Sequence, residues 1–148
     1  MFRHLLVTLD GSPRGESVLP YASTISRSMG AEVTLLRVVD AGTAEWSERG
    51  AIGKAAADAT AHARSVEQAE AYLERIAVRL ADDASRVRTI VRQGHPAREI
   101  VATARELDAD AIAMATHSRR GINRLMFGSV AEQVLHESSL PVLLIRAA

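Results

Sequence analysis

The sequence predicts an α/β protein built on a doubly wound, five-stranded parallel sheet with helices on both faces. Short apolar runs rich in leucine and β-branched residues alternate with segments whose apolar residues recur every three or four positions. Several of the runs are almost continuously apolar, which is typical of strands covered on both faces. Five such strands alternating with four helices favour a parallel sheet. The length of 148 residues fits one domain, so we expect residues 1–148 to form a single domain.

Local signals place the individual elements along the chain. The strands are expected at His4 to Leu9, Val33 to Val39, Arg86 to Arg92, Asp110 to Ala115 and Val142 to Ile145. The helices are expected from Ser12-Pro13 to Gly30, through Val66 to Leu80, from Ala97 to about Leu107, and from Ser129 onward with Val130, Val134 and Leu135 facing inward. Ser12 followed by Pro13 is typical of an N-cap and the first helical position. Residues 40–63 show no clear pattern.

Composition and charge exclude several classes of protein. Eighteen basic residues balance eighteen acidic ones, whereas proteins that coat nucleic acid or membrane surfaces carry a basic excess. The absence of cysteine excludes disulfides, thiolate nucleophiles and Cys-ligated metals. No apolar run reaches the roughly 18 residues of a membrane span, and Asp10 comes too early for a signal peptide. We therefore expect a cytoplasmic protein with neither nucleic acid nor membrane as partner.

Ligands of open α/β sheets bind beyond the carboxyl ends of the strands, where the strand order reverses. The candidate loops are those near Asp10, near Val38 to Asp40, and from Ala115 to Ser129. The standard phosphate motifs are absent: the only lysine, Lys54, lacks the first glycine of a Walker loop, and the loop after Asp10 lacks the spacing of the dinucleotide fingerprint.

One candidate anion site remains, at the start of the last helix. Gly128 and Ser129 would place backbone N–H groups and a hydroxyl at a helix N-terminus, the positive end of the helix dipole. The preceding loop adds three arginines, Arg119, Arg120 and Arg124. Ser129 and Glu132 also have the spacing of a capping box, which would explain both residues without a ligand.

Four segments resemble the universal stress protein family and together span nearly the whole chain except about 41–63. The resemblance is carried by Met114 to Glu132, Pro141 to Ile145, Leu5 to Ser12 and Thr34 to Asp40. It implies a Rossmann-like fold of the adenine nucleotide alpha hydrolase type. ATP-binding members share Gly-x-x-Gly, nine further residues and Gly-Ser/Thr. This chain keeps Gly128-Ser129 and has Ala115 and Ser118 in the first two glycine positions.

The resemblance also implies a nucleotide site. An adenosine pocket would be bounded by Asp10, Val38 and Met114, with the backbone of Ala115 near the ribose and with Ser118, Gly128, Ser129 and Val130 around the phosphates. A divalent ion such as Mg²⁺ would bridge the phosphates. Asp10 has the alternative role of a polar residue that simply terminates its strand.

The leading interpretation is a dimeric stress sensor or regulator that binds ATP or a related adenine nucleotide. The last strand, Val142 to Ile145, lies at a sheet edge and carries no charge, so we expect a homodimer to form through it. The alternative is a nucleotide-free dimeric interaction module of the same fold, motivated by Ala115 and Ser118. Weak ATP hydrolysis or self-phosphorylation is a third interpretation, for which no general base is evident. The protein partner is not identified by the sequence.

Overall fold

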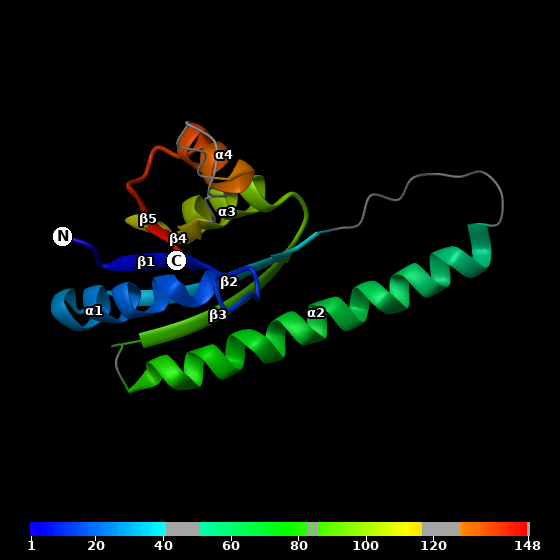
Figure 1. Ribbon diagram of the computed structural model, residues 1–148, viewed down its shortest axis with the longest axis horizontal. Coiled ribbons are helices and arrows are strands. Elements are labelled where there is room, and N and C mark those ends of the chain that lie inside the picture. Colours follow the sequence, from blue (N-terminus) through cyan, green and yellow to red (C-terminus); the bar gives the residue numbers. More distant parts are fainter. Residues whose placement is uncertain (41–50, 83, 85, 117–127, 148) are drawn as a thin grey trace.

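The computed structural model describes residues 1–40, 51–82, 84, 86–116 and 128–147, and for 51–58 the backbone only. It contains a five-stranded parallel sheet with helices on both faces (Figure 1), which confirms the predicted fold class. The strands are β1 His4–Thr8, β2 Glu32–Val39, β3 Arg86–Gln93, β4 Ala111–Thr116 and β5 Val142–Arg146. The helices are the 3₁₀ helix η1 Gly15–Val18, α1 Leu19–Met29, α2 Ala51–Ala81, α3 Pro96–Glu106 and α4 Ser129–Glu137.

The strand order β3-β2-β1-β4-β5 places β1 at the centre of the sheet. The chain winds outward from β1 to β3, then returns to β4 on the other side of β1 and continues to β5. The winding direction therefore reverses between β1 and β4. In parallel sheets such a reversal opens a crevice beyond the carboxyl ends of the two strands, and ligands bind there.

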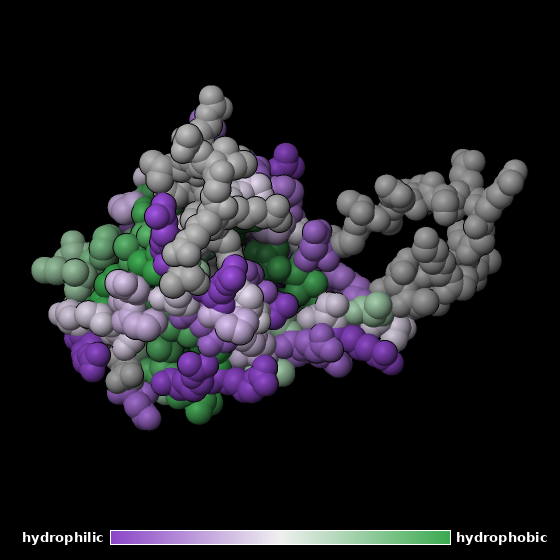
Figure 2. Space-filling model, viewed as in Figure 1, coloured by the Kyte–Doolittle hydropathy of each residue, from purple (hydrophilic) through white to green (hydrophobic). Residues whose placement is uncertain are grey.

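Each face of the sheet has its own apolar core, because successive residues of a strand point to opposite faces. Leu5 and Val7 of β1 pack with α1 and α2, whereas Leu6 between them packs with α3 and α4. Figure 1 shows α1 and α2 on one side of the sheet and α3 and α4 on the other. In the space-filling view, the surface along α2 is mostly hydrophilic (Figure 2).

The first helix starts later than the sequence predicted. Ser12 is not its N-cap, because the Ser12 backbone N–H and hydroxyl both donate to Asp10 Oδ1, at 2.9 and 2.6 Å. The same hydroxyl accepts a hydrogen bond from the Gly15 N–H at 3.0 Å, which closes a turn within the loop. The α-helix begins only at Leu19, after the short η1. Its predicted end is confirmed, since Gly30 caps α1 with φ of 66°.

The second helix is longer than its apolar periodicity predicted, with 31 residues from Ala51. Of the apolar positions expected to face the core, Ala69, Leu73, Ile76 and Leu80 are buried, and Val66 is partly buried. The N-terminal part is rich in alanine, which is a strong helix former but gives no apolar stripe to read. None of the helices in the described residues is both long enough and apolar enough to span a membrane.

The two outer strands differ in how they meet solvent. On β3, charged residues protect the edge, as is typical of edge strands: Arg88 forms an ion pair with Glu32, and Arg92 forms one with Glu106. On β5, all four residues Val142 to Ile145 are apolar and only partly buried.

Candidate functional site

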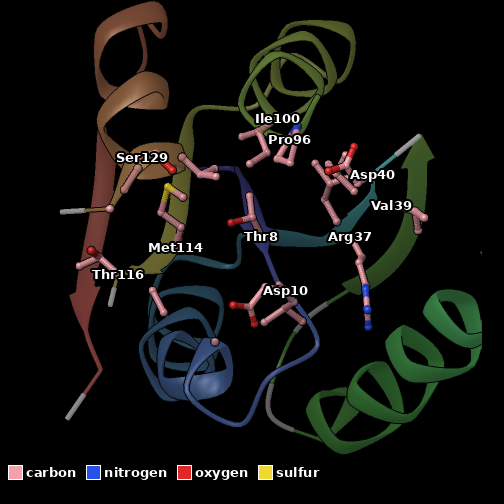
Figure 3. A pocket seen from close by; sticks show the side chains of 18 of the residues that line it. Thr8, Asp10, Arg37, Val39, Asp40, Pro96, Ile100, Met114, Thr116 and Ser129 are labelled. Carbon is pink, nitrogen blue, oxygen red and sulfur yellow. The ribbon is translucent and has the colours of Figure 1, made fainter. Parts of the chain in front are cut away.

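A pocket of about 590 Å³ opens at the carboxyl ends of β1, β2 and β4 (Figure 3). This volume lies within the usual range of small-molecule sites. Seven of the eight predicted site residues line it: Asp10, Val38, Met114, Ala115, Gly128, Ser129 and Val130. The eighth, Ser118, lies outside the described residues. Two further polar lining residues, Asp40 and Thr116, lie in the predicted candidate loops. The sequence did not identify the polar lining residues Thr8, Arg37, Ser65 and Gln68.

The N-terminus of α4 forms one side of the pocket. The predicted capping box is wrong: Gly128 is the N-cap, Ser129 is the first helical residue, and no side chain among the described residues caps the helix. Glu132 instead donates its backbone N–H to the Gly128 carbonyl at 3.0 Å, the first bond of the helix. The N–H groups of the three preceding residues have no partner within the helix, so they can donate to an anion.

Gly128 has the backbone conformation that this arrangement needs. Its φ of 84° and ψ of 149° fall in a region that is accessible to glycine and costly for other residues. Ala115, which replaces a glycine of the family motif, has no such requirement, because Asp108 is the only non-glycine residue with positive φ in the described ranges. Alanine therefore fits the backbone at position 115 without strain.

The prediction of which α4 side chains face inward was only partly confirmed. Val134 is fully buried as expected, but Leu135 is 42% exposed, so it does not face inward. The inner face of α4 carries Ala131 and Val134, and Val130 is partly buried against the same core.

Asp10 lies at the end of β1, on the floor of the pocket. One of its carboxylate oxygens, Oδ1, holds the following loop through the two bonds from Ser12. Gly15 packs so closely against this oxygen that a Cβ at position 15 would contact it. Asp10 therefore shapes the loop, and it also offers a negative charge to the pocket.

The wall next to α3 and α4 is apolar. Met114 is buried, Pro96 and Ile100 of α3 come toward the pocket (Figure 3), and Val38 of β2 also lines it. An apolar wall with a few polar groups around it is the usual composition of a small-molecule site. This wall can cover the flat face of a ring, while the polar groups meet its edges and substituents.

The side of the pocket next to α2 is polar, and Arg37 lines both this pocket and a neighbouring groove along α2 that includes Tyr72. Arg37 is the only charged position within the run Val33 to Val39, which is the signal by which the sequence could have identified it. Its guanidinium carbon lies 5.4 Å from the centre of the Tyr72 ring, a cation–π distance. The Tyr72 hydroxyl donates to Glu16 at 3.2 Å. Burial of Tyr72 raises the pKa of its hydroxyl, and the negative charge of Glu16 raises it further by a smaller amount, so the hydroxyl remains a donor.

Solved structures of the same fold include two with nucleotides. One is a universal stress protein in complex with cAMP, with a TM-score of 0.69, 18% identity, and coverage of 99% of this chain and 98% of that one. The other is the universal stress protein from Archaeoglobus fulgidus in complex with dAMP, with a TM-score of 0.65, 21% identity, and 98% of each chain covered. At these identities the likeness shows the shared fold.

Similarity to the universal stress protein MJ0577 of Methanocaldococcus jannaschii extends over whole chains. The sequences are 27% identical over 157 residues, which cover 99% of this chain and 96% of the relative. The solved structure of MJ0577 has a TM-score of 0.82 and covers 100% of this chain and 98% of its own. The family model described as the universal stress protein family matches residues 1–146. The chain therefore belongs to the universal stress protein family.

Proposed function

We propose that this protein binds ATP or a related adenine nucleotide in the cytoplasm and acts as a dimeric sensor or regulator in a stress response. The observation that carries the proposal is the uncapped N-terminus of α4, which opens onto the pocket opposite Asp10 and Val38. The cAMP and dAMP complexes support it, since they are universal stress proteins of the same fold that hold adenine nucleotides.

Each part of the nucleotide has a matching part of the pocket. The phosphates would accept hydrogen bonds from the N–H groups at Ser129 and Val130 and from the Ser129 hydroxyl. The adenosine would pack against Met114 and Val38, with the ribose near Ala115 and Asp10 at the edge. A Mg²⁺ ion would bind mainly to the phosphates, because Mg²⁺ usually combines substrate phosphates with one or two carboxylates.

The experiment begins with freshly purified protein, denatured so that any bound small molecule is released for chromatography and mass spectrometry. Calorimetric titration of the stripped protein with ATP and Mg²⁺ follows. A stoichiometric adenine nucleotide, or a calorimetric ATP affinity in the micromolar range, would support the proposal. An empty protein that ignores millimolar ATP would contradict it and favour the nucleotide-free interaction module.

The dimer part of the proposal rests on the exposed edge of β5. Among the strands that the structure describes, β5 pairs with β4 alone, so the backbone groups of its other edge face outward beside half-buried apolar side chains. An unprotected edge of this kind is a template for pairing with another strand. Two copies joined through β5 would form a continuous sheet and cover the four apolar residues Val142 to Ile145.

A matched pair of edge variants tests this arrangement. Leu144→Arg places a charge on β5, and Val91→Arg places one on β3, where residue 91 is also partly buried in an edge strand. We expect Leu144→Arg to shift the protein to monomer in light scattering after gel filtration, because the charge would be buried in the interface. Val91→Arg should keep the oligomeric state of the parent protein. A parent protein that is monomeric, or equal behaviour of the two variants, would contradict pairing through β5.

A further inference from the structure

The groove along α2 is a second cavity, of about 920 Å³, beside the pocket. Gly11 and Arg37 form one side of it, and α2 forms the other side between Gln68 and Arg79. Most of the α2 side chains that line the groove are exposed, and Val78 is 74% exposed. Sites for small molecules usually enclose most of their ligand. This groove is open along its length, so its shape suits an extended segment of chain.

Arg37 reaches the groove from β2, and Figure 3 shows its side chain pointing toward α2. The guanidinium packs against Gly11, where a Cβ would collide with it, and its carbon lies 5.4 Å from the centre of the Tyr72 ring. Among the described residues, Arg37 has no ion pair or hydrogen bond. Contact with a ring face and a backbone leaves the guanidinium N–H donors unfilled. Because the group is already held in place, it loses little conformational entropy when an acceptor binds to it.

The charges of the groove favour an anionic occupant. Arg75 and Arg79 of α2 line it together with Arg37, and the described lining includes one carboxylate, that of Glu74. Arg79 is already paired with Glu16, at 3.1 Å. Arg75, like Arg37, has no ion pair within the described ranges. Two guanidinium groups in the groove are therefore available to carboxylates from outside the chain.

The length and the apolar residues of the groove favour a peptide as the occupant. From Gln68 to Arg79, α2 advances by eleven residues, or about 16 Å. An extended chain covers this distance with about five residues. Ala71 and Val78 flank Arg75 along the helix and offer apolar surface, which a peptide side chain can cover and a phosphate backbone cannot. The balanced charge of the whole chain also lacks the basic excess that nucleic-acid binding requires.

We propose that the groove along α2 binds an extended acidic segment of a partner protein. Carboxylates of the segment pair with Arg37 and Arg75, and an apolar side chain between them packs on Val78. Pairs of guanidinium and carboxylate form two parallel hydrogen bonds, which fix the direction of the bound segment as well as adding affinity. This inference goes beyond the proposed nucleotide function. Although Arg37 and Gln68 line both cavities, peptide binding is measured without nucleotide.

The test titrates the stripped full chain into a fluorescein-labelled peptide and follows the fluorescence anisotropy. The peptide is about five residues long, with a central leucine and glutamates on both sides, and the reference peptide has glutamine in place of each glutamate. Arg75→Gln removes one guanidinium from an exposed position, and Arg37→Met keeps an unbranched chain over the Tyr72 ring. Arg98→Gln is the matched control, because Arg98 is also exposed but lies on α3, across the sheet from α2 (Figure 1).

The parent protein should bind the glutamate peptide with a dissociation constant below about 1 mM, and the glutamine peptide about tenfold more weakly or less. Arg75→Gln and Arg37→Met should each weaken binding of the glutamate peptide by about fivefold or more, as expected for the loss of a charged hydrogen-bonded pair. Arg98→Gln should bind it like the parent protein.

No binding of the glutamate peptide, equal affinity for the two peptides, or an equal loss in Arg98→Gln would overturn the inference. A labelled oligothymidylate that binds the groove more tightly than the peptide would assign it to nucleic acid instead. A change of oligomeric state in Arg75→Gln, measured by light scattering, without peptide binding to the parent protein would assign the groove to a second copy of the chain. Each of these results leaves the proposed function intact, because that function is tested separately by ATP titration.

Discussion

The two ends of the sheet differ in how they use polar groups. At the amino ends of the strands, polar side chains are paired within the protein. His4 contacts the Leu107 carbonyl through Nδ1 and the Thr34 hydroxyl through Nε2, at 3.2 and 2.7 Å. The Asp110 carboxylate accepts backbone N–H groups of Arg3 and His4 at 2.7 and 2.8 Å. At the carboxyl ends, a pocket is lined by the start of α4 and by polar residues that include Asp10, Asp40 and Gln68.

This difference separates stability from binding within one sheet. Hydrogen bonds at the amino ends link β1 to the segments beside it and give the buried Thr34 hydroxyl a partner, which stabilises the fold. Donors left unused at the carboxyl ends cost little while water solvates them, and they become available when a ligand enters. Changes at the amino ends should therefore lower stability and leave ligand affinity unaltered, and changes at the carboxyl ends should lower affinity.

The largest expected effect comes from Gly128→Ala compared with Gly30→Ala. Both glycines have positive φ, 84° at Gly128 and 66° at Gly30. Gly128 is the N-cap of α4, and Gly30 is the C-cap of α1. Each alanine should cost about 1 kcal/mol of stability because of its backbone conformation. Only Gly128→Ala should also reduce ATP affinity, by tenfold or more, since the N–H groups of α4 would shift away from the phosphates. Calorimetry and chemical denaturation on both variants check this, and equal ATP affinities would remove Gly128 from the site.

A medium effect is expected for Thr34→Val at the opposite end of the sheet. Thr34 is fully buried, and valine has nearly its shape but lacks the hydroxyl that meets His4 Nε2. The unfilled ring nitrogen should cost about 1–2 kcal/mol in free energy of unfolding. Urea denaturation measures this loss. Nucleotide affinity should be unchanged, and a fall in affinity similar to that of Gly128→Ala would contradict the separation of the two ends.

The sequence predicted the fold well because its elements are marked by apolar pattern and by glycine. The prediction failed where a side chain could form hydrogen bonds with several local partners. Ser12 reads as a helix N-cap, but its hydroxyl and N–H are taken by Asp10, two residues earlier. Ser129 reads as a cap as well, but the positive φ of Gly128 makes the glycine the cap.

The sequence predicted only part of the site, because some of its residues come together only through tertiary packing. A family motif identified the residues at Asp10 and Gly128, since their spacing along the chain is fixed by the fold. The wall formed by α2 could not be predicted, because α2 follows a segment without a readable pattern and its register on the sheet sets which side chains reach the pocket. Gln68 and Ser65 therefore enter the site only through tertiary packing.

The smallest expected effect is a pH dependence from Asp110 at the amino ends. The backbone N–H groups of Arg3 and His4 donate hydrogen bonds to the Asp110 carboxylate, and these bonds, that from Arg3 most, lower the pKa of Asp110 below its ordinary value. A carboxyl group with a lowered folded-state pKa stabilises the protein above its unfolded pKa of about 3.9. That contribution is lost as the pH falls through the folded-state pKa. Asp110→Asn should therefore be less stable than the parent protein at pH 6, and the difference should shrink as the pH is lowered below about 4. Denaturation at a series of pH values measures it, and a constant difference across the series would show that the charge of Asp110 does not stabilise the fold.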